Sequence, residues 1–182
     1  MDLKTYNHTT YALLGILTLD CRTGYEIKQL IDQSLNHFWK ISYGQIYPNL
    51  KKLVTDGLAT VKVKSQDGKP DRKEYFLTTK GKEVLQNWLA EPLQQITDER
   101  NEVLLKLFFS RHQPADQTQS LLLHYKEELQ KKIDTYKAIE EMIMNWNPQS
   151  PDATYWLYTL DYGRRTTRAA IEWCEATIEK IK

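Results

Sequence analysis

A capped helix followed directly by a basic hairpin constrains this chain more than any other feature. Residues 42–58 have the pattern of a helix with a polar and basic outer face, and a predicted hairpin rich in Lys and Arg follows at 59–77. Ser42 and Gln45 form a capping-box pair at the start of the helix, and Gly57 marks its end. A helix followed by a basic β-ribbon is suited to entering a DNA groove and holding the backbone beside it.

The helix at 42–58 has two distinct faces. Its buried face is predicted from apolar residues at i, i+4, i+7 and i+8, which are Ile46, Leu50, Leu53 and Val54. At about 100° per residue, the opposite face carries Gly44, Gln45, Pro48, Lys51, Lys52 and Thr55. Pro48 lies too deep to be a first-turn proline. It removes one helical hydrogen bond, so we expect bent or loosened first turns.

The elements around this helix predict a winged helix-turn-helix domain. Thr23 and Glu26 form a second capping-box pair, Asp67-Gly68 is a hairpin turn signal within a polar loop at 65–71, and Thr78 caps a further helix. The predicted order is helices at 9–19, 24–35 and 42–58, strands at 59–64 and 72–77, and a fourth helix. The second and third helices make the helix-turn-helix pair, and the two strands make the wing.

Charge and composition agree with a DNA-binding first half. Residues 1–90 carry 13 Lys/Arg against 9 Asp/Glu, a net of +4, whereas residues 91–182 carry 12 against 15, a net of −3. Such a split indicates a polyanionic partner for the first half. The longest apolar run is far below the ~20 residues that cross a bilayer, and the first residues lack a signal-peptide layout. We therefore expect a cytoplasmic protein without a membrane partner.

Enzyme, metal and cofactor signals are not found in the sequence. Cys21 and Cys174 lie far apart, neither belongs to a CxxC motif, and no histidine stands at ligand spacing from them. The histidines lie on different segments without a triad or metal pattern, and there is no GxGxxG or P-loop. We expect two buried thiols, no catalytic residues, no metal and no cofactor.

The second half predicts long helices and a dimer. Pro92 lies in a hinge at 91–97, which gives domains at 1–92 and 93–182. Helices are predicted at 98–111, with Leu104, Leu105, Leu107, Phe108 and Phe109 buried, and at 115–146 and 152–181. The last helix has a heptad seam of Leu157, Leu160, Arg164, Thr167, Ile171, Cys174, Ile178 and Ile181. Antiparallel long helices without a full set of partners in the chain indicate a homodimer, and we expect the C-terminal helices to be exchanged between subunits.

Aromatic residues cluster around the start of the last helix. One hypothesis is an effector site for a small aromatic or phenolic ligand, with Arg164 or a tyrosine hydroxyl at its polar end. The other is that the rings pack in the dimer core and Arg164 pairs with a glutamate. The residues concerned are Trp146, Tyr155, Trp156, Tyr158, Tyr162 and Arg164.

Several motifs together resemble the PadR family of bacterial transcriptional regulators, in its longer type. The matching stretches are 11–17, 24–27, 44–53, 56–58 and 72–81, and 102–109 resembles the start of the family's C-terminal region. The resemblance implies a mainly α fold, with an N-terminal winged helix-turn-helix domain and a C-terminal dimerisation domain. It also implies a homodimeric repressor that binds a palindromic double-stranded DNA operator and that a small aromatic ligand can release.

The predicted DNA contacts follow from residue chemistry. The Gln45 amide suits a bidentate contact to adenine, and the hydroxyls of Ser42, Tyr43 and Tyr47 suit phosphates. The remaining candidates are backbone-gripping cations, namely Lys51 and Lys52 on the helix and Lys69, Arg72 and Lys73 on the wing. The alternatives are that these are solvated surface charges and that Tyr47 packs in the core. A winged helix used only for protein contacts and a metal-sensing winged-helix repressor are the rival functions.

Overall fold

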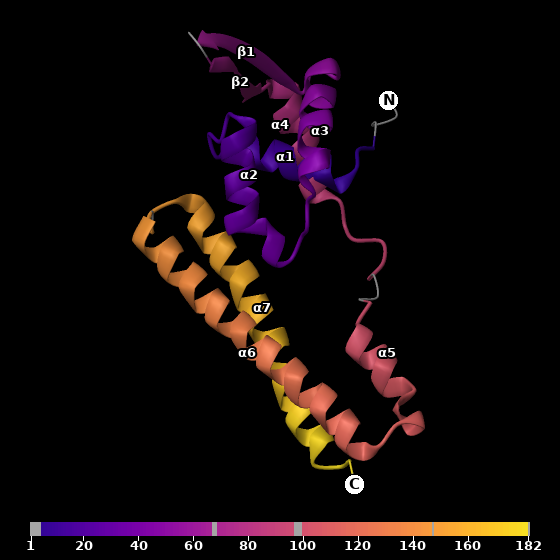
Figure 1. Ribbon diagram of the computed structural model, residues 1–182. Helices are drawn as coiled ribbons and strands as arrows, with labels where there is room; N and C mark the ends of the chain where they lie inside the picture. The colour runs from indigo at the N-terminus through magenta and orange to yellow at the C-terminus, as the bar shows by residue number, and fades with distance from the viewer. Residues whose placement is uncertain (1–4, 67–68, 97–99, 147, 182) are drawn as a thin grey trace. The chain divides into compact units, whose positions relative to one another are not determined.

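The computed structural model describes residues 5–66, 69–96, 100–146 and 148–181, apart from the side chains of Gln66, Lys69, Pro70 and Trp146. Two compact units are present, residues 1–95 and 96–182 (Figure 1). The prediction of a mainly helical fold with a two-stranded wing is confirmed. Among the described helices, none is long and apolar enough to cross a membrane.

The N-terminal unit is built of helices around one apolar core. The core side chains include Leu13, Leu14, Ile27, Ile31, Ile46, Leu50, Leu53 and Leu58, which are all almost fully buried. Three helix faces and the base of the wing therefore share one core. The elements are α1 (His8–Thr18), α2 (Gly24–Gln33), η1 (Leu35–His37), α3 (Tyr43–Thr55), β1 (Ala59–Gln66), β2 (Lys69–Leu77) and α4 (Thr79–Ala90).

Short-range signals place the ends of these helices. The Thr23 hydroxyl accepts from the Glu26 N–H, and the Glu26 carboxylate accepts in return from the Thr23 N–H at 2.9 Å. Gly57 follows α3 with a φ of +72°, a left-handed conformation in which glycine is least strained. At the start of α4, a Cβ on Gly81 would lie 2.2 Å from the Leu58 backbone oxygen. Only glycine fits at position 81, because α4 passes close to the backbone of Leu58 there.

The wing is an antiparallel pair tied to the rest of the unit at its base. Ala59 pairs with Leu77 and Lys64 with Arg72, with an irregularity between Lys64 and Gln66. The Tyr75 N–H donates to the Arg22 carbonyl at 2.8 Å, which joins β2 to the turn before α2. The strands run further than predicted, because much of the expected loop at 65–71 is strand; a proline is tolerated in a ribbon that has two edge strands. The predicted Asp67-Gly68 turn lies outside the described residues.

The C-terminal unit is dominated by two long helices, α6 (Ala115–Trp146) and α7 (Pro151–Ile178), which lie side by side in Figure 1. The Gln119 Nε2–H donates to the Ile181 carbonyl at 3.0 Å, so the start of α6 meets the end of α7. The pair is therefore antiparallel. A Cβ on Gly163 would lie 2.8 Å from the buried Tyr136 ring, so α7 approaches α6 closely at this glycine.

One expectation for this unit needs correction, and another stays a prediction. The seam of α7 includes buried Leu160, Thr167 and Cys174, and α6 of the same chain contacts α7, while the exchange of C-terminal helices between subunits stays a prediction. The helix expected at 98–111 is α5 (Glu102–Phe108) followed by η2 (Ser110–His112). Four of its five predicted core residues are 49–81% exposed, because a helix this short packs on α6 by one face only; they are Leu104, Leu105, Phe108 and Phe109.

Candidate nucleic-acid interface

The N-terminal turn of α3 presents Gln45 to solvent. Burial of Ile46, Leu50 and Leu53 turns the opposite face of the helix outward, and Ser42 and Gln45 are both exposed. The Gln45 Oε1 accepts a hydrogen bond from the Ser42 N–H at 3.1 Å. The side chain that we expect to read a base thus folds back to cap its own helix in the unbound protein.

Tyr43 joins the first turn of α3 to α2. Its hydroxyl donates to the Asp32 carboxylate, with oxygen–oxygen distances of 2.6 and 2.7 Å. The Lys28 ammonium lies 4.0 Å from the Tyr43 ring centroid. The hydrogen bond to Asp32 raises the pKa of the Tyr43 hydroxyl. A phosphate contact from this hydroxyl would compete with Asp32, a relation that sequence spacing does not reveal.

Tyr47 lies where α2, α3 and the wing come together. Its ring occupies the space beside Gly24, where an added Cβ would meet a ring carbon at 2.5 Å. Burial raises the pKa of the Tyr75 hydroxyl on β2, and interaction with Tyr47 adds to this effect. Tyr47 is still 60% exposed. It supports the helix-turn-helix with one edge and leaves the other open to a partner.

The two lysines of α3 differ in their surroundings. Lys51 and Lys52 are both exposed, as predicted for the outer face of the helix. The Lys52 ammonium lies 5.7 Å from the ring centroid of Tyr6, which precedes α1. Both ammonium groups are accessible to a polyanion, and the aromatic face limits where Lys52 can point.

Arg72 and Lys64 lie on a wing face that carries its own negative charges. Arg72 contacts Glu26 at 3.2 Å and Glu74 at 3.3 Å, and the Lys64 Nζ lies 2.9 Å from Glu74. The hydrogen bond from Lys64 lowers the pKa of the Glu74 carboxyl against the opposing effect of burial. Hydrogen bonds from the Thr23 and Arg22 N–H groups likewise outweigh burial at Glu26 and lower its pKa. Both carboxylates are therefore anions at neutral pH and partly neutralise this face.

The opposite face of the wing carries Lys73. Lys73 pairs with Val63 across the ribbon, and both are exposed. The predicted phosphate contact at Lys69 lies outside the described side chains. Strand alternation therefore separates the predicted wing cations, with Arg72 on one face and Lys73 on the other.

Sequence interpretation missed further cations at the wing base. The Lys62 ammonium lies 5.0 Å and the Arg22 guanidinium 4.9 Å from the Phe76 ring centroid. Lys62 and Lys64 share the face of Arg72, because their cross-strand partners are Glu74 and Arg72. The alternation of lysine and valine at 61–64 was the signal that would have found them.

The predicted effector residues do not form an enclosed site in the described unit. Tyr155, Tyr158 and Tyr162 are 67–72% exposed on one side of α7, and the first two meet edge to face with centroids 6.2 Å apart. Arg164 pairs with Glu140 of α6 and with Asp161, which matches the interpretation that it pairs with a glutamate. Trp156 is half-buried, and the Trp146 side chain lies outside the described residues.

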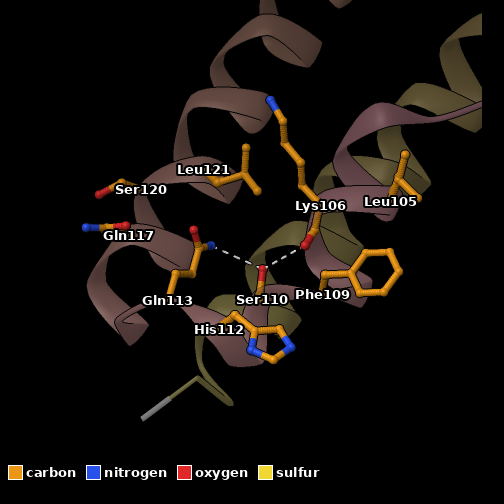
Figure 2. A pocket seen from close by; sticks show the side chains of 9 residues that line it. All are labelled: Leu105, Lys106, Phe109, Ser110, His112, Gln113, Gln117, Ser120 and Leu121. Carbon is orange, nitrogen blue, oxygen red and sulfur yellow. Dashed lines mark hydrogen bonds between the residues drawn. The ribbon is translucent and has the colours of Figure 1, made fainter.

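An open hollow of about 780 Å³ lies instead between α5 and α6. Figure 2 shows Leu105, Lys106 and Phe109 on one side and Leu121 on the other, with Gln113 donating to the Ser110 hydroxyl below them. Its lining combines apolar and polar side chains, and the hollow is open to solvent. The hollow continues the exposed apolar surface of α5.

Comparisons with known proteins cover both units. Residues 13–87 match the model of the transcriptional regulator PadR-like family, and residues 99–182 match that of the virulence activator alpha C-terminal region. The negative transcriptional regulator PadR of Bacillus subtilis is 30% identical over 94% of this chain and 96% of its own length.

Two crystal structures of that relative are also similar to this chain. B. subtilis PadR in complex with operator DNA has a TM-score of 0.85, at 27% identity, over 97% of this chain and 100% of that one. The same protein in complex with p-coumaric acid has a TM-score of 0.78, at 26% identity, over 94% of this chain and 97% of that one. By family model, sequence and fold, the chain belongs to the PadR-like family of transcriptional regulators.

Proposed function

We propose that this chain is a repressor that binds an operator through the N-terminal half of α3 and through the wing. One observation carries the proposal: α3 buries Ile46, Leu50 and Leu53 completely and leaves a polar, basic face exposed next to a basic ribbon. Gln45 contacts a base, and the hydroxyls and cations of both elements contact phosphates. The crystal structure of the B. subtilis relative with operator DNA supports this assignment. Such a protein acts in the cytoplasm, where its DNA is.

Residues 1–92 serve as the DNA-binding domain in this proposal, and residues 93–182 serve for dimerisation and response to an effector. The exposed Leu104, Leu105, Phe108 and Phe109 of α5 supply apolar surface for a second copy. A two-fold dimer presents its two recognition helices about 34 Å apart, one turn of DNA, which suits a palindromic operator.

The effector in this proposal is a small phenolic acid. The B. subtilis relative is known in complex with p-coumaric acid. Exposed tyrosines on α7 offer ring faces that a second copy would enclose, and the candidate residues stay those named from the sequence: Trp146, Tyr155, Trp156, Tyr158, Tyr162 and Arg164. Arg164 already pairs with Glu140. It would bind the carboxylate of a phenolic acid only by giving up its ion pair with Glu140.

DNA binding is tested by a shift assay on the DNA upstream of the protein's own gene, after footprinting, at several salt concentrations. Lys73→Ala is expected to weaken binding to all sequences and to reduce the slope of log K against log salt by about 0.9, one phosphate contact. Lys82→Ala, an equal charge change on an exposed position of α4, is expected to leave the slope unchanged. A protein-interaction module, the rival function, would give no sequence preference and no footprint.

The effector is tested by titrating p-coumaric acid into the protein and into its complex with the operator. We expect heat of binding and loss of the shifted band over the same concentration range. Binding without release would contradict the regulatory proposal while leaving the DNA-binding proposal standing.

A further inference from the structure

Asn49 forms a polar link between two helices next to the proline of α3. Its Nδ2–H donates to the Gln45 backbone carbonyl at 2.7 Å. Its Oδ1 accepts a hydrogen bond from the Thr10 hydroxyl of α1 at 3.0 Å. Both ends of one amide are therefore held, and they connect the backbone of Gln45 to α1.

Thr10 is the buried end of this link. Its side chain is fully buried, and its hydroxyl also lies 2.8 Å from the Oδ1 of Asn7, which caps α1 by accepting from the Thr10 N–H. The one hydroxyl hydrogen is shared between the two amide oxygens, and Asn7 Oδ1 also accepts from the Thr10 N–H. Loss of the hydroxyl would therefore deprive mainly the Asn49 Oδ1 of its donor, which is unfavourable away from water. The orientation of Asn49 is thus set by the interior of the domain.

Pro48 explains why such a link is useful at this point. A proline inside a helix lacks the N–H that would bond to the carbonyl four residues earlier, and it loosens the preceding turn. Asn49 follows Pro48 directly and supplies an additional donor to that same turn. The carbonyl that lacks its helical donor is that of Gly44, and the Asn49 side chain adds a hydrogen bond to the carbonyl of the next residue, Gln45, in the same turn.

We propose that Asn49 and Thr10 are positioning residues that set the direction in which α3 presents Gln45 to a base edge. The inference rests on the proposed function, because it requires Gln45 to read a base. A bidentate contact to adenine requires both amide atoms to meet the base edge, so a small tilt of the turn weakens it. Lysine contacts to phosphate tolerate the same tilt, because the side chain is long and flexible.

The test compares three variants of the full-length protein. Thr10→Val removes the hydroxyl at nearly constant shape, Thr10→Ser keeps it, and Asn49→Ala removes the amide. Dissociation constants are measured at one salt concentration for the footprinted operator and for operators in which each A·T pair is replaced in turn by G·C. Unrelated DNA gives the non-specific affinity, and circular dichroism checks folding.

Thr10→Val and Asn49→Ala are expected to lower discrimination at one A·T position by about tenfold, the range of a single base contact. Their affinity for unrelated DNA and their salt slope stay at the wild-type values, and Thr10→Ser keeps wild-type discrimination. If Thr10→Val does not fold, Asn49→Ala decides the question, since Asn49 is half-buried and alanine is the best helix former.

Two results would overturn the positioning role: unchanged discrimination in Asn49→Ala, or an equal loss of affinity for operator and unrelated DNA. A wild-type protein that does not distinguish the operators would instead remove the proposed function itself. The two failures are therefore separated by the wild-type measurement.

Discussion

The two units differ in how completely they bury their own apolar side chains. The N-terminal unit encloses a continuous core of aliphatic side chains from α1, α2, α3 and the wing base. The C-terminal unit buries one seam between α6 and α7 and leaves large apolar side chains exposed on α5, with Phe108 at 81%. One unit closes its core within the chain, whereas the other leaves on α5 apolar surface of the kind that marks protein–protein interfaces.

In the proposed function, this difference separates DNA binding by the N-terminal unit from dimerisation by the C-terminal unit. A domain with a complete core holds the recognition helix in a defined orientation whatever the C-terminal unit does. A domain whose apolar surface is completed by another copy has a stability that depends on protein concentration. In the proposed function, an effector that binds this surface changes the spacing of the two DNA-binding units and leaves their interiors unaltered.

The largest effect on stability is expected from Gly81→Ala, which disturbs the packing of the N-terminal unit. The new Cβ would lie 2.2 Å from the backbone oxygen of Leu58, and neither α4 nor β1 can yield without breaking contacts. We expect a loss of about 3 kcal/mol or more in the free energy of unfolding. Urea unfolding followed by amide hydrogen exchange in α1 and α4 measures it.

Gly15→Ala is the matched control, because its Cβ would meet nothing within 4 Å in the described structure and Gly15 lies inside α1. It is expected to stabilise the unit by about 0.5–1 kcal/mol, since alanine has less backbone entropy to lose. Equal effects of the two substitutions would show that close packing at Gly81 is unimportant.

Phe108→Ser is expected to have the next largest effect, and it acts on the open unit. Because Phe108 is 81% exposed within the chain, the substitution removes little intramolecular packing. We expect the dissociation constant of the dimer to rise about tenfold or more, as for a buried aromatic anchor at an interface. Sedimentation analysis over a concentration series measures it.

Leu93→Ser is the control for this substitution. Leu93 is 92% exposed and lies before α5 in the chain. The substitution therefore removes an apolar side chain that is as accessible as Phe108 but lies outside α5. The dimer constant is expected to stay at its wild-type value. A Phe108 variant that dimerises as well as wild type would mean that α5 is not part of the interface.

The smallest effect concerns pH and the wing. The Glu74 pKa lies below its ordinary value of about 4.3, so its ion pairs with Lys64 and Arg72 stabilise the fold above that pH. Their contribution is lost as the pH falls through the lowered pKa. Glu74→Gln is therefore expected to reduce stability at pH 7 and to have a smaller effect at pH 2.5. Urea midpoints at both pH values measure the difference.

Glu83→Gln provides the comparison for Glu74, since Glu83 is an exposed carboxylate of α4. The effect of Glu83→Gln on the urea midpoint is expected to differ less between the two pH values than the effect of Glu74→Gln. A Glu74 variant with the same pH dependence as wild type would contradict the role of its ion pairs.

Local signals explain how much of the fold was predictable from the sequence. Ser42 and Thr78 immediately precede α3 and α4, and Pro114 and Pro148 bracket a helix predicted at 115–146 and found at those bounds. Caps and prolines act within one turn, so a linear sequence contains the whole signal. The buried face of α3 was predicted for the same reason, because periodicity is local.

Features that depend on contacts between distant segments were not predicted. The spacing of Tyr43 and Asp32 gives no sign that the hydroxyl of one donates to the carboxylate of the other. The apolar residues of α5 were expected to be buried, yet hydrophobicity alone does not say whether the covering atoms belong to the same molecule. The partial neutralisation of Arg72 likewise depends on Glu26, which lies 46 residues away in the sequence.

The hydrogen bond from the Ser42 N–H to the Gln45 side chain has a consequence for how such regulators diverge. A glutamate at position 45 would keep this cap, because its carboxylate accepts the same bond. It would favour cytosine, whose amino group donates, over adenine. If Gln45 reads a base as proposed, one codon change at position 45 would redirect the protein to other operators without weakening the start of α3.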